Sequence, residues 1–178
     1  MRIIAGKHKG RKFPELKASG VRPTLDRVRE NFFNIISQKV QNSTFLDLFS
    51  GSGAMGIEAL SRGAKQVVFC DKSREIVSYI SKIGDMLGEK FEIYCSDYRS
   101  VLKRLQDSFD IIYLDPPYEM DGNEVLNELY SSTVCGQDSI VVYERSSEKS
   151  FELKSNFEII DERKYGIAVL TFLRKKNG

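Results

Sequence analysis

The stretch LDLFSGSGAMG, residues 46–56, runs from an apolar segment into a glycine-rich turn, and the fold class can be predicted from it. Gly51, Gly53 and Gly56 satisfy the spacing G-x-G-x-x-G, and Asp71 follows at the end of the next apolar segment. In open α/β sheets such a loop links the first strand to a helix, and ligands bind beyond the carboxyl ends of the strands. Glycine is expected here because a side chain would keep the backbone away from the ligand.

Apolar segments typical of strands occur around and after this loop. They cover residues 44–49, 66–70, 91–95, 110–115, 139–144, 157–161 and 168–173. Helical patterns fall between the earlier ones, at 54–62, 73–87, 98–107 and 122–132. This alternation predicts an α/β fold with a seven-stranded, mainly parallel, doubly wound sheet. The last two segments are joined by too few residues for a crossover helix, so we expect an antiparallel last strand. Such a sheet is typical of the class I S-adenosylmethionine (SAM)-dependent methyltransferase fold, a Rossmann-like architecture.

A basic N-terminal extension over residues 1–41 precedes the Rossmann-like domain expected over residues 42–178. The extension holds ten Lys or Arg residues and three acids, whereas the whole chain has a net charge of only +2. A basic segment on a mildly acidic body predicts a polyanionic partner such as a nucleic acid. The alternative is a solvated surface segment, because charge runs are often no more than that.

Two elements are expected within the extension. Residues 1–20 alternate short apolar pieces with glycine and lysine, which predicts a strand or hairpin. A helix is expected to follow Pro23, with Thr24 as its N-cap. Its apolar face would be formed by Leu25, Val28, Phe32, Phe33, Ile35 and Ile36.

Length and composition exclude several classes of protein. The 178 residues suffice for about one domain, and no apolar stretch approaches the roughly 18 residues of a membrane span. The N-terminus lacks the apolar region of a signal peptide, so we expect a cytoplasmic protein without a membrane partner. The short chain, with no apolar helix face that looks exposed, favours a monomer. One histidine and three widely spaced cysteines offer no metal-ligand spacing. Cys70 and Cys95 lie in strand-like segments, where we expect buried, reduced thiols.

Acidic residues at the strand ends distinguish two cofactors for the glycine loop. Asp47 lies four residues before Gly51, whereas a nicotinamide site keeps this approach apolar for its pyrophosphate. SAM has no phosphate and carries a sulfonium and an ammonium, so nearby carboxylates favour it. Asp71 is placed to accept hydrogen bonds from the ribose hydroxyls, and Asp97 to accept one from the adenine amino group. The alternative is that Asp47 and Asp97 merely cap helices. The predicted cofactor site comprises Asp47, Phe49, Ser50, Gly51, Gly53, Gly56, Asp71, Lys72, Asp97 and Tyr98.

The DPPY segment Asp115-Pro116-Pro117-Tyr118 ends the fourth strand and is the candidate catalytic site. Prolines fix the backbone and remove N–H groups, so the Asp115 carboxylate and the Pro116 carbonyl can converge on one NH2 group. Held in this way, the nitrogen lone pair leaves conjugation and points at the methyl carbon. Tyr118 offers a flat face to an unstacked base. A simple turn would explain the prolines alone. The sequence leaves open whether Asp115 or water takes the proton.

With these segments in place, the chain resembles the RsmD family of bacterial enzymes that methylate guanine N2 in the RNA of the small ribosomal subunit. The resemblance rests on residues 1–13, 22–36, 47–73 and 110–118. It implies SAM as cofactor, the DPPY residues as the target-amine site, and guanine 966 of 16S rRNA as the target.

Candidates for RNA phosphate contacts, which position RNA without reading its sequence, lie in the N-terminal extension. They are Arg2, Lys7, Lys9, Arg11, Arg22, Arg27 and Arg29. Arg22 and Arg29 could equally hold the extension or a substrate loop near the active site through ion pairs.

Three other functions stay open at this point. A DNA adenine-N6 or cytosine-N4 methyltransferase shares a DPPY-type site, but it usually carries a separate target-recognition domain. A nicotinamide-dependent oxidoreductase shares the glycine loop, but no Tyr-x-x-x-Lys pair follows it. A non-catalytic RNA-binding module could retain affinity for SAM, although the intact DPPY segment argues against it. Whether naked RNA or an assembled subunit would be the substrate is also open.

Overall fold

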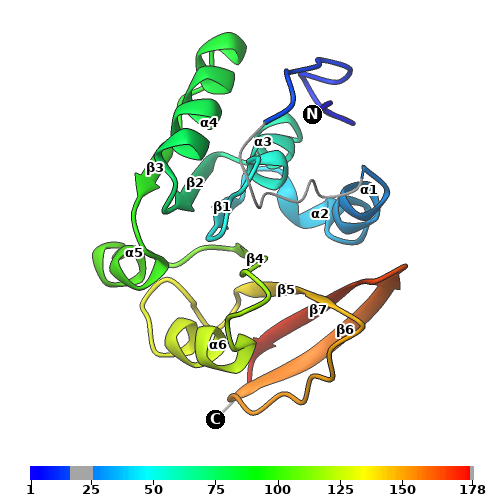
Figure 1. Ribbon diagram of the computed structural model, residues 1–178, viewed down its shortest axis with the longest axis vertical. Coiled ribbons are helices and arrows are strands. Elements are labelled where there is room, and N and C mark those ends of the chain that lie inside the picture. The colour runs from blue at the N-terminus through cyan, green and yellow to red at the C-terminus, as the bar shows by residue number, and fades with distance from the viewer. Residues whose placement is uncertain (17–25, 177–178) are drawn as a thin grey trace.

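Seven strands form one sheet in the order β3-β2-β1-β4-β5-β7-β6 (Figure 1). In the computed structural model, which describes residues 1–16 and 26–176, these strands are β1 Thr44–Asp47, β2 Gln66–Asp71, β3 Glu92–Cys95, β4 Ile111–Leu114, β5 Ile140–Ser146, β6 Phe157–Tyr165 and β7 Ala168–Lys175. Strands β1 to β5 run parallel, and β7 pairs antiparallel with both β5 and β6. The predicted mainly parallel sheet with an antiparallel last strand is therefore confirmed.

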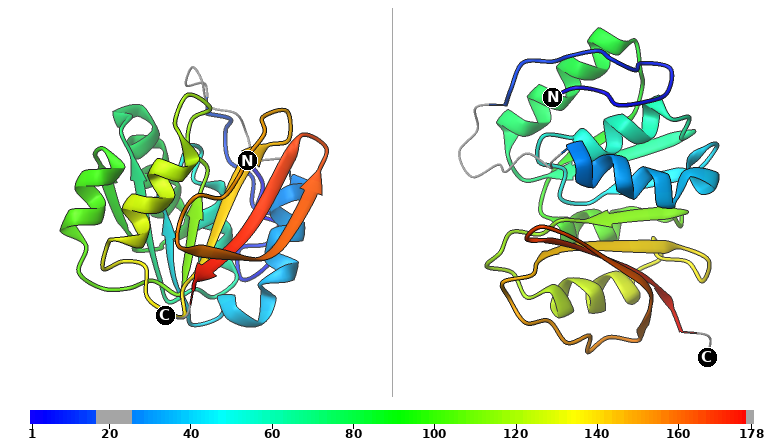
Figure 2. Two further views of the ribbon diagram at one scale, coloured as in Figure 1. Left: turned by 90° about the horizontal axis from the view of Figure 1, so that it is seen from below. Right: turned by 90° about the vertical axis from the view of Figure 1, so that its right-hand side faces the viewer.

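Helices cover both faces of the sheet (Figure 2). They are α1 Asp26–Ile35, α2 Ser37–Val40, α3 Ala54–Ser61, α4 Arg74–Leu87, α5 Tyr98–Arg104 and α6 Gly122–Tyr130. The apolar residues of α1, α3 and α4 form one buried cluster with the sheet, and those of α5 and α6 form a second cluster. This division into two cores is what a doubly wound sheet with right-handed crossovers requires.

Local sequence signals set the ends of α4, the longest of the described helices. Ser73 precedes it, and its hydroxyl accepts a hydrogen bond from the backbone N–H of Ile76 at 3.4 Å. Gly88 ends it with a φ of 68°, a left-handed conformation that favours glycine. The predicted helix over residues 73–87 is therefore confirmed.

Two predicted burials are wrong for reasons of position. Cys95 is exposed, because its strand β3 lies at the edge of the sheet. Ile35 is 40% exposed, whereas Ile36 is buried. Ile35 is the last residue of α1, whereas Ile36 lies between α1 and α2 and packs into the cluster formed by α1, α3 and α4. Val28, Phe32 and Phe33 are buried as expected. Thr24 and Leu25 lie outside the described residues.

The start of the chain folds back on itself and packs against the core of the sheet. A single antiparallel bridge joins Arg2 to Lys12, and the N–H of Ile3 donates to the Arg11 carbonyl at 3.0 Å. Ile3 and Phe13 are buried in the same cluster as α1, α3 and α4. The predicted hairpin is thus irregular, and it shares its core with the sheet. The domain boundary between residues 41 and 42 stays a prediction.

A buried carboxylate on α3 anchors this N-terminal segment. Glu58 is 1% exposed and accepts hydrogen bonds from the backbone N–H groups of Ile4 and Ala5, both at 2.9 Å. Its other neighbours are the guanidinium groups of Arg62, at 2.8 Å, and Arg29, at 3.8 Å. A buried carboxylate is stable only when cations and N–H donors surround it, so this cluster depends on all its members.

Within residues 1–16 and 26–176, no helix is both long enough and apolar enough to cross a membrane.

Replacing Glu58 by alanine should leave two backbone N–H groups and the Arg62 guanidinium without their shared acceptor, and the buried Arg29 guanidinium without a neighbouring negative charge. We expect the free energy of unfolding to fall by roughly 3–5 kcal/mol. The matched control Glu124→Ala removes an exposed carboxylate that pairs with Arg99. It should cost less than about 1 kcal/mol. Urea denaturation of the three proteins measures both values, and equal losses would contradict the anchoring role of Glu58.

Candidate active site

A cleft of about 630 Å³ opens at the carboxyl ends of the parallel strands. Its walls come from the loops after β1, β2, β3 and β4, from the end of β5, and from the turn between β6 and β7. The strand order reverses between β1 and β4, so the cleft lies at the topological switch point, where open α/β sheets bind their ligands. Its volume suits a drug-sized molecule or cofactor.

The N–H groups of the three motif glycines are bonded within the protein itself. Gly51 donates to the Asp71 carboxylate at 3.0 Å, and Gly53 donates to the Ser50 carbonyl at 2.8 Å. Gly56 donates to the buried Asp47 carboxyl group at 3.2 Å. A pyrophosphate would need such N–H groups for itself, so this loop is not arranged as a dinucleotide site.

Two of the three glycines are needed for packing, so the expected reason for them is wrong. Gly53 has a φ of 73°, and a Cβ there would lie 2.8 Å from the Ile80 side chain. A Cβ on Gly56 would collide with the ring of Phe69. Gly53 therefore lets the loop pack closely against α4, and Gly56 lets α3 approach β2. Of the three, Gly51 alone lines the cleft.

Asp47 and Ser50 support the loop from behind and do not line the cleft. Asp47 is 1% exposed. The Ser50 hydroxyl donates to the Asp47 carbonyl at 2.8 Å and accepts from the Cys70 N–H at 3.0 Å. Burial raises the pKa of Asp47 to about 7, and the charge of Asp71 adds to that shift. The idea that Asp47 places a charge beside the cofactor is therefore not supported by its position.

Asp71 and Asp97 do line the cleft, each from the end of a strand. The Asp71 carboxylate accepts from the N–H groups of Gly51 and Ser73, at 3.0 and 2.9 Å. Asp97 caps α5 by accepting from the Arg99 N–H at 2.9 Å. The helix-cap interpretation therefore holds for Asp97, and the same side chain also reaches the cleft. Both acids are pre-positioned hydrogen-bond acceptors.

Two aromatic rings and a lysine complete this half of the cleft. The rings of Phe49 and Tyr98 lie 5.1 Å apart with a tilt of 46°. Tyr98 is buried, and this burial, together with the nearby Glu128 carboxylate, raises the pKa of its hydroxyl. Lys72 is exposed on the rim. The predicted cofactor residues that meet in the cleft are thus Phe49, Gly51, Asp71, Lys72, Asp97 and Tyr98.

The DPPY segment forms the opposite half of the cleft. All four of its residues line the cleft, with Pro116 buried and Tyr118 51% exposed. The Met120 N–H donates to the Pro117 carbonyl at 3.0 Å, which closes a turn after the strand. Lys149 donates to the Tyr118 carbonyl at 2.6 Å, and its ammonium lies 5.7 Å from the ring centroid. The turn and this lysine hold the aromatic ring at the mouth of the cleft.

Two parts of the cleft wall were not predicted from the sequence. Glu144 and Arg145 reach the cleft from the end of β5, and Tyr165, Gly166 and Ile167 reach it from the turn after β6. The position of Glu144 in the cleft could have been predicted, because it lies at the end of the fifth strand segment and parallel strands share one carboxyl edge. The turn gave no such signal, because only the antiparallel return of β6 and β7 brings it to this edge.

The cleft is strongly acidic among the described residues. Its walls carry six carboxyl side chains, from Asp71, Glu75, Asp97, Asp115, Glu119 and Glu144, and two basic side chains, from Lys72 and Arg145. A narrow site lined by one sign of charge attracts ligands of the opposite sign. This electrostatic field favours a cationic ligand and disfavours a pyrophosphate.

The basic side chains of the extension lie at two places. Arg11 donates to the Met86 carbonyl at 2.8 Å, and Lys7 pairs with Glu89 at 2.6 Å. Met86 lies near the end of α4, and Glu75, near the start of the same helix, lines the cleft. Met86 follows Glu75 by eleven residues, or about 16 Å along the helix. The tip of the hairpin therefore sits at the end of α4 that is remote from the cleft.

The prediction that Arg29 contacts RNA phosphate is wrong, because its side chain is buried. Its side chain is 2% exposed and donates to the Arg2 carbonyl and to Asp26, the latter at 3.0 Å. This fits the alternative that Arg29 holds the extension. Arg2 is exposed and pairs with Asp26 at 3.5 Å. Lys9 and Arg27 are also exposed. Arg22 lies outside the described residues.

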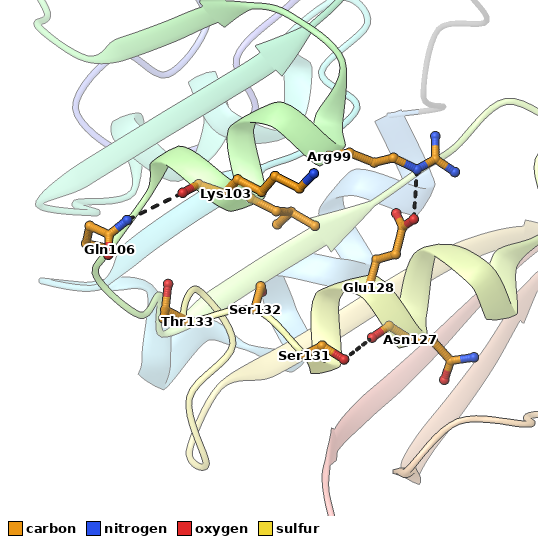
Figure 3. A pocket seen from close by; sticks show the side chains of 9 residues that line it. Arg99, Lys103, Gln106, Asn127, Glu128, Ser131, Ser132 and Thr133 are labelled. Atoms are coloured by element: carbon orange, nitrogen blue, oxygen red, sulfur yellow. Dashed lines mark hydrogen bonds and ion pairs between the residues drawn. The ribbon is translucent and has the colours of Figure 1, made fainter.

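A second hollow of about 650 Å³ lies on the surface between α5 and α6 (Figure 3). Arg99 and Lys103 line it from α5, Gln106 lines it from the segment after α5, and Asn127 and Glu128 line it from α6. Arg99 and Glu128 form an ion pair at 2.7 Å across it. It contains none of the predicted site residues and no strand end, so we assign the site to the first cleft. The described residues contain no cluster of His, Cys, Asp and Glu suited to a metal ion.

Several known proteins are similar to this chain in sequence or in fold. The family described as Conserved hypothetical protein 95 matches residues 1–174. Ribosomal RNA small subunit methyltransferase D of Haemophilus influenzae is 33% identical over 173 residues, which cover 94% of this chain and 90% of that protein. The structure of a hypothetical protein from Thermus thermophilus has a TM-score of 0.84 and 26% identity, over 99% of each chain. A structure described as a methyltransferase complexed with SAH has a TM-score of 0.65 at 14% identity, over 83% of this chain and 48% of that one, and shows the shared fold alone.

The Asp47 carboxyl group should make stability depend on pH with a defined sign. Its pKa is about 7 in the folded chain, against an ordinary value of 3.8. Between these values folding retains a proton that unfolding releases, so the stabilisation from this group is complete below about pH 4 and is lost as the pH rises to about 7.

We therefore expect wild type to lose stability relative to Asp47→Asn between about pH 4 and 7, by up to about 4 kcal/mol. The asparagine keeps an acceptor for the Gly56 N–H but does not titrate. Urea denaturation of both proteins at about pH 4.5, 6 and 7.5 measures the difference. A difference that stays constant over this range would show that the folded Asp47 ionises normally.

Proposed function

The chain belongs to the Conserved hypothetical protein 95 family, the RsmD family, and we propose that it methylates ribosomal RNA with SAM as methyl donor. The proposed acceptor is the exocyclic N2 of a guanine in the RNA of the small ribosomal subunit. One observation carries the proposal. The acids at the ends of β2 and β3 and the DPPY segment at the end of β4 line opposite halves of one acidic cleft.

The residues of the cleft fit SAM better than a nicotinamide dinucleotide. Asp71 would accept hydrogen bonds from the ribose hydroxyls and Asp97 from the adenine amino group, while Phe49 and Tyr98 supply apolar surface. The acidic walls favour the sulfonium and ammonium groups. The N–H groups of Gly51, Gly53 and Gly56 are already bonded within the protein, which leaves these three unavailable to a pyrophosphate. When bound, this cofactor supplies a methyl group on a positively charged sulfur.

The DPPY segment would hold the target amine. The Asp115 carboxylate and the Pro116 carbonyl accept one hydrogen bond each from the NH2 group, which directs its lone pair toward the methyl carbon. On accepting the methyl group the nitrogen would lose one proton, either to the Asp115 carboxylate or to water. Tyr118, exposed at the mouth of the cleft, would stack on the unstacked base.

The class of substrate comes from the family. The Haemophilus influenzae relative is named a ribosomal RNA small subunit methyltransferase, and the match covers most of both chains. The guanine N2 position is the finer part of the proposal and comes from the resemblance to the RsmD family. The exposed cations Arg2, Lys7, Lys9, Arg11 and Arg27 are the proposed phosphate contacts. Arg27 adjoins Val28 of the cleft wall, so it is the one best placed to contact RNA near the target base.

Methyl-labelled SAM tests the whole proposal. The protein is incubated with small subunits that lack the modification, with the corresponding naked RNA, and with duplex DNA, and the labelled nucleoside is identified after nuclease digestion. N2-methylguanosine from the subunit or its RNA is the expected product. Label in N6-methyladenine or N4-methylcytosine of DNA would overturn the RNA assignment. Absence of label, with SAM binding intact, would favour a non-catalytic RNA-binding module.

Asp115→Ala should separate catalysis from cofactor binding. Because the carboxylate is proposed to contact only the target amine, we expect kcat to fall by about 10²–10³-fold. The Kd for SAM, measured by calorimetry, should change by less than about three-fold. Asp138→Ala, which removes an exposed acid outside the cleft, is the matched control and should leave both values unchanged. A loss of SAM affinity as large as the loss of kcat would place Asp115 in the cofactor half.

Single substitutions of exposed cations should reveal the RNA-binding surface. Lys9→Ala and Arg27→Ala should each lower the slope of log Kd against log salt by about 1, because each removes one phosphate contact. Lys103→Ala removes an exposed cation from the surface hollow on α5 and should leave the slope unchanged. Filter binding of the substrate RNA between about 50 and 200 mM salt measures the slopes. Equal slopes in wild type and all three variants would exclude Lys9 and Arg27 from the interface.

A further inference from the structure

Two acids stand side by side at the acceptor half of the cleft. Asp115 directly follows β4, and Glu144 lies near the end of β5. The last paired residues of these neighbouring parallel strands are Leu114 and Tyr143, so Asp115 and Glu144 occupy corresponding positions. Neighbouring strands lie about 4.8 Å apart. Both acids line the cleft, and the DPPY chemistry accounts for only one of them.

A buried tyrosine orients the second acid. Tyr113 is buried in β4, and its ring packs edge-on against Phe32 at 5.4 Å. Its hydroxyl donates a hydrogen bond to one carboxylate oxygen of Glu144. Burial, followed by the negative charges of Glu144 and Asp115, raises the pKa of Tyr113 well above its usual range. The hydroxyl therefore keeps its proton and stays a donor, which presents Glu144 as a fixed acceptor.

The Watson–Crick edges of the two purines differ in what they offer to a pair of acids. Guanine places an N1–H donor beside its N2 amino group, so two adjacent donors face outward. Adenine places the N1 lone pair, an acceptor, beside its N6 amino group. A second carboxylate next to the amine site would gain a hydrogen bond from guanine and would face an unsatisfied, repelled lone pair in adenine.

We propose that the Glu144 carboxylate accepts a hydrogen bond from N1–H of the target guanine while Asp115 and the Pro116 carbonyl hold its N2 amino group. This inference rests on the proposed function and names the residue that makes it selective for guanine. Glu144 is in this account a specificity-determining residue. Tyr113 is a positioning residue, because it acts on the substrate only through Glu144.

A base analogue distinguishes recognition of N1–H from a structural role of Glu144. 2,6-Diaminopurine keeps the 2-amino group of guanine but has an N1 acceptor in place of N1–H. RNAs that carry either base at the methylated position are compared, both naked and assembled into small subunits. We expect wild type to prefer guanine by at least about 100-fold in kcat/KM.

Glu144→Gln should change this preference in a defined direction. Its amide keeps an acceptor and adds an NH2 donor that suits the N1 of diaminopurine. We expect kcat/KM for the guanine RNA to fall by about 30-fold, and kcat/KM for the diaminopurine RNA to stay the same or rise. The preference for guanine should then shrink to less than about ten-fold. A purely structural loss would lower both values by the same factor.

Two further variants keep the test independent of folding. Tyr113→Phe keeps the ring and removes the hydroxyl that positions Glu144, so we expect an intermediate preference for guanine. Glu162→Gln is the matched control, because Glu162 also accepts a hydroxyl hydrogen bond, from Thr171 at 2.9 Å, but does not line the cleft. It should keep the wild-type preference. Thermal melting and the Kd for SAM verify that each variant is folded.

The outcomes separate the inference from the proposed function. One outcome is that wild type methylates guanine while Glu144→Gln lowers kcat/KM for both RNAs by the same factor, or for neither RNA. In that case Glu144 does not read the base and the inference is overturned. The proposed function then stands. If wild type transfers no methyl group to guanine in RNA or subunits, the proposed function fails and the inference fails with it. A fall in kcat/KM of Glu144→Gln on the guanine RNA alone supports both the proposed function and the inference.

Discussion

The close approach of α3 to the sheet at Gly56 is the constraint on which the rest of the site depends. A side chain at this position would collide with Phe69, so glycine alone lets the helix start directly over β2. At this distance the buried Asp47 carboxyl group reaches the Gly56 N–H, and Asp71 reaches the Gly51 N–H. The loop is therefore held in one conformation by the protein's own acids before any ligand binds.

This arrangement also sets the electrostatic character of the cleft. In a dinucleotide site the loop N–H groups and the helix N-terminus face a pyrophosphate. Here carboxyl groups from β1 and β2 take those positions, and Asp97, Asp115 and Glu144 extend the acidic lining across the strand ends. The same glycine spacing thus yields a site that favours a cation, because acids surround this loop whereas a dinucleotide site leaves it open to a pyrophosphate. The N-terminal segment is tied to this unit through Glu58 on α3, two residues beyond Gly56.

Much of the fold and about half of the site follow from patterns that are local in the chain. Alternating apolar segments and helical periodicity predicted each strand and its direction, because each βαβ unit has one handedness and parallel strands share one carboxyl edge. That edge gathers Asp71, Asp97 and the DPPY segment without further information. Their types and spacing were visible in the sequence, so their convergence could be predicted.

Tertiary structure alone decided which side chains are buried and which hydrogen bonds they make. The sequence places Arg29 among surface cations, yet the fold buries it against Glu58 and the Arg2 carbonyl. It also engages the N–H groups of the three motif glycines within the protein, and brings Glu144, with its tyrosine partner, beside Asp115. The physical reason is that periodicity and spacing report on neighbours within a few residues. Burial and hydrogen-bond partners depend on segments tens of residues away, which only the packed sheet and its helices bring together.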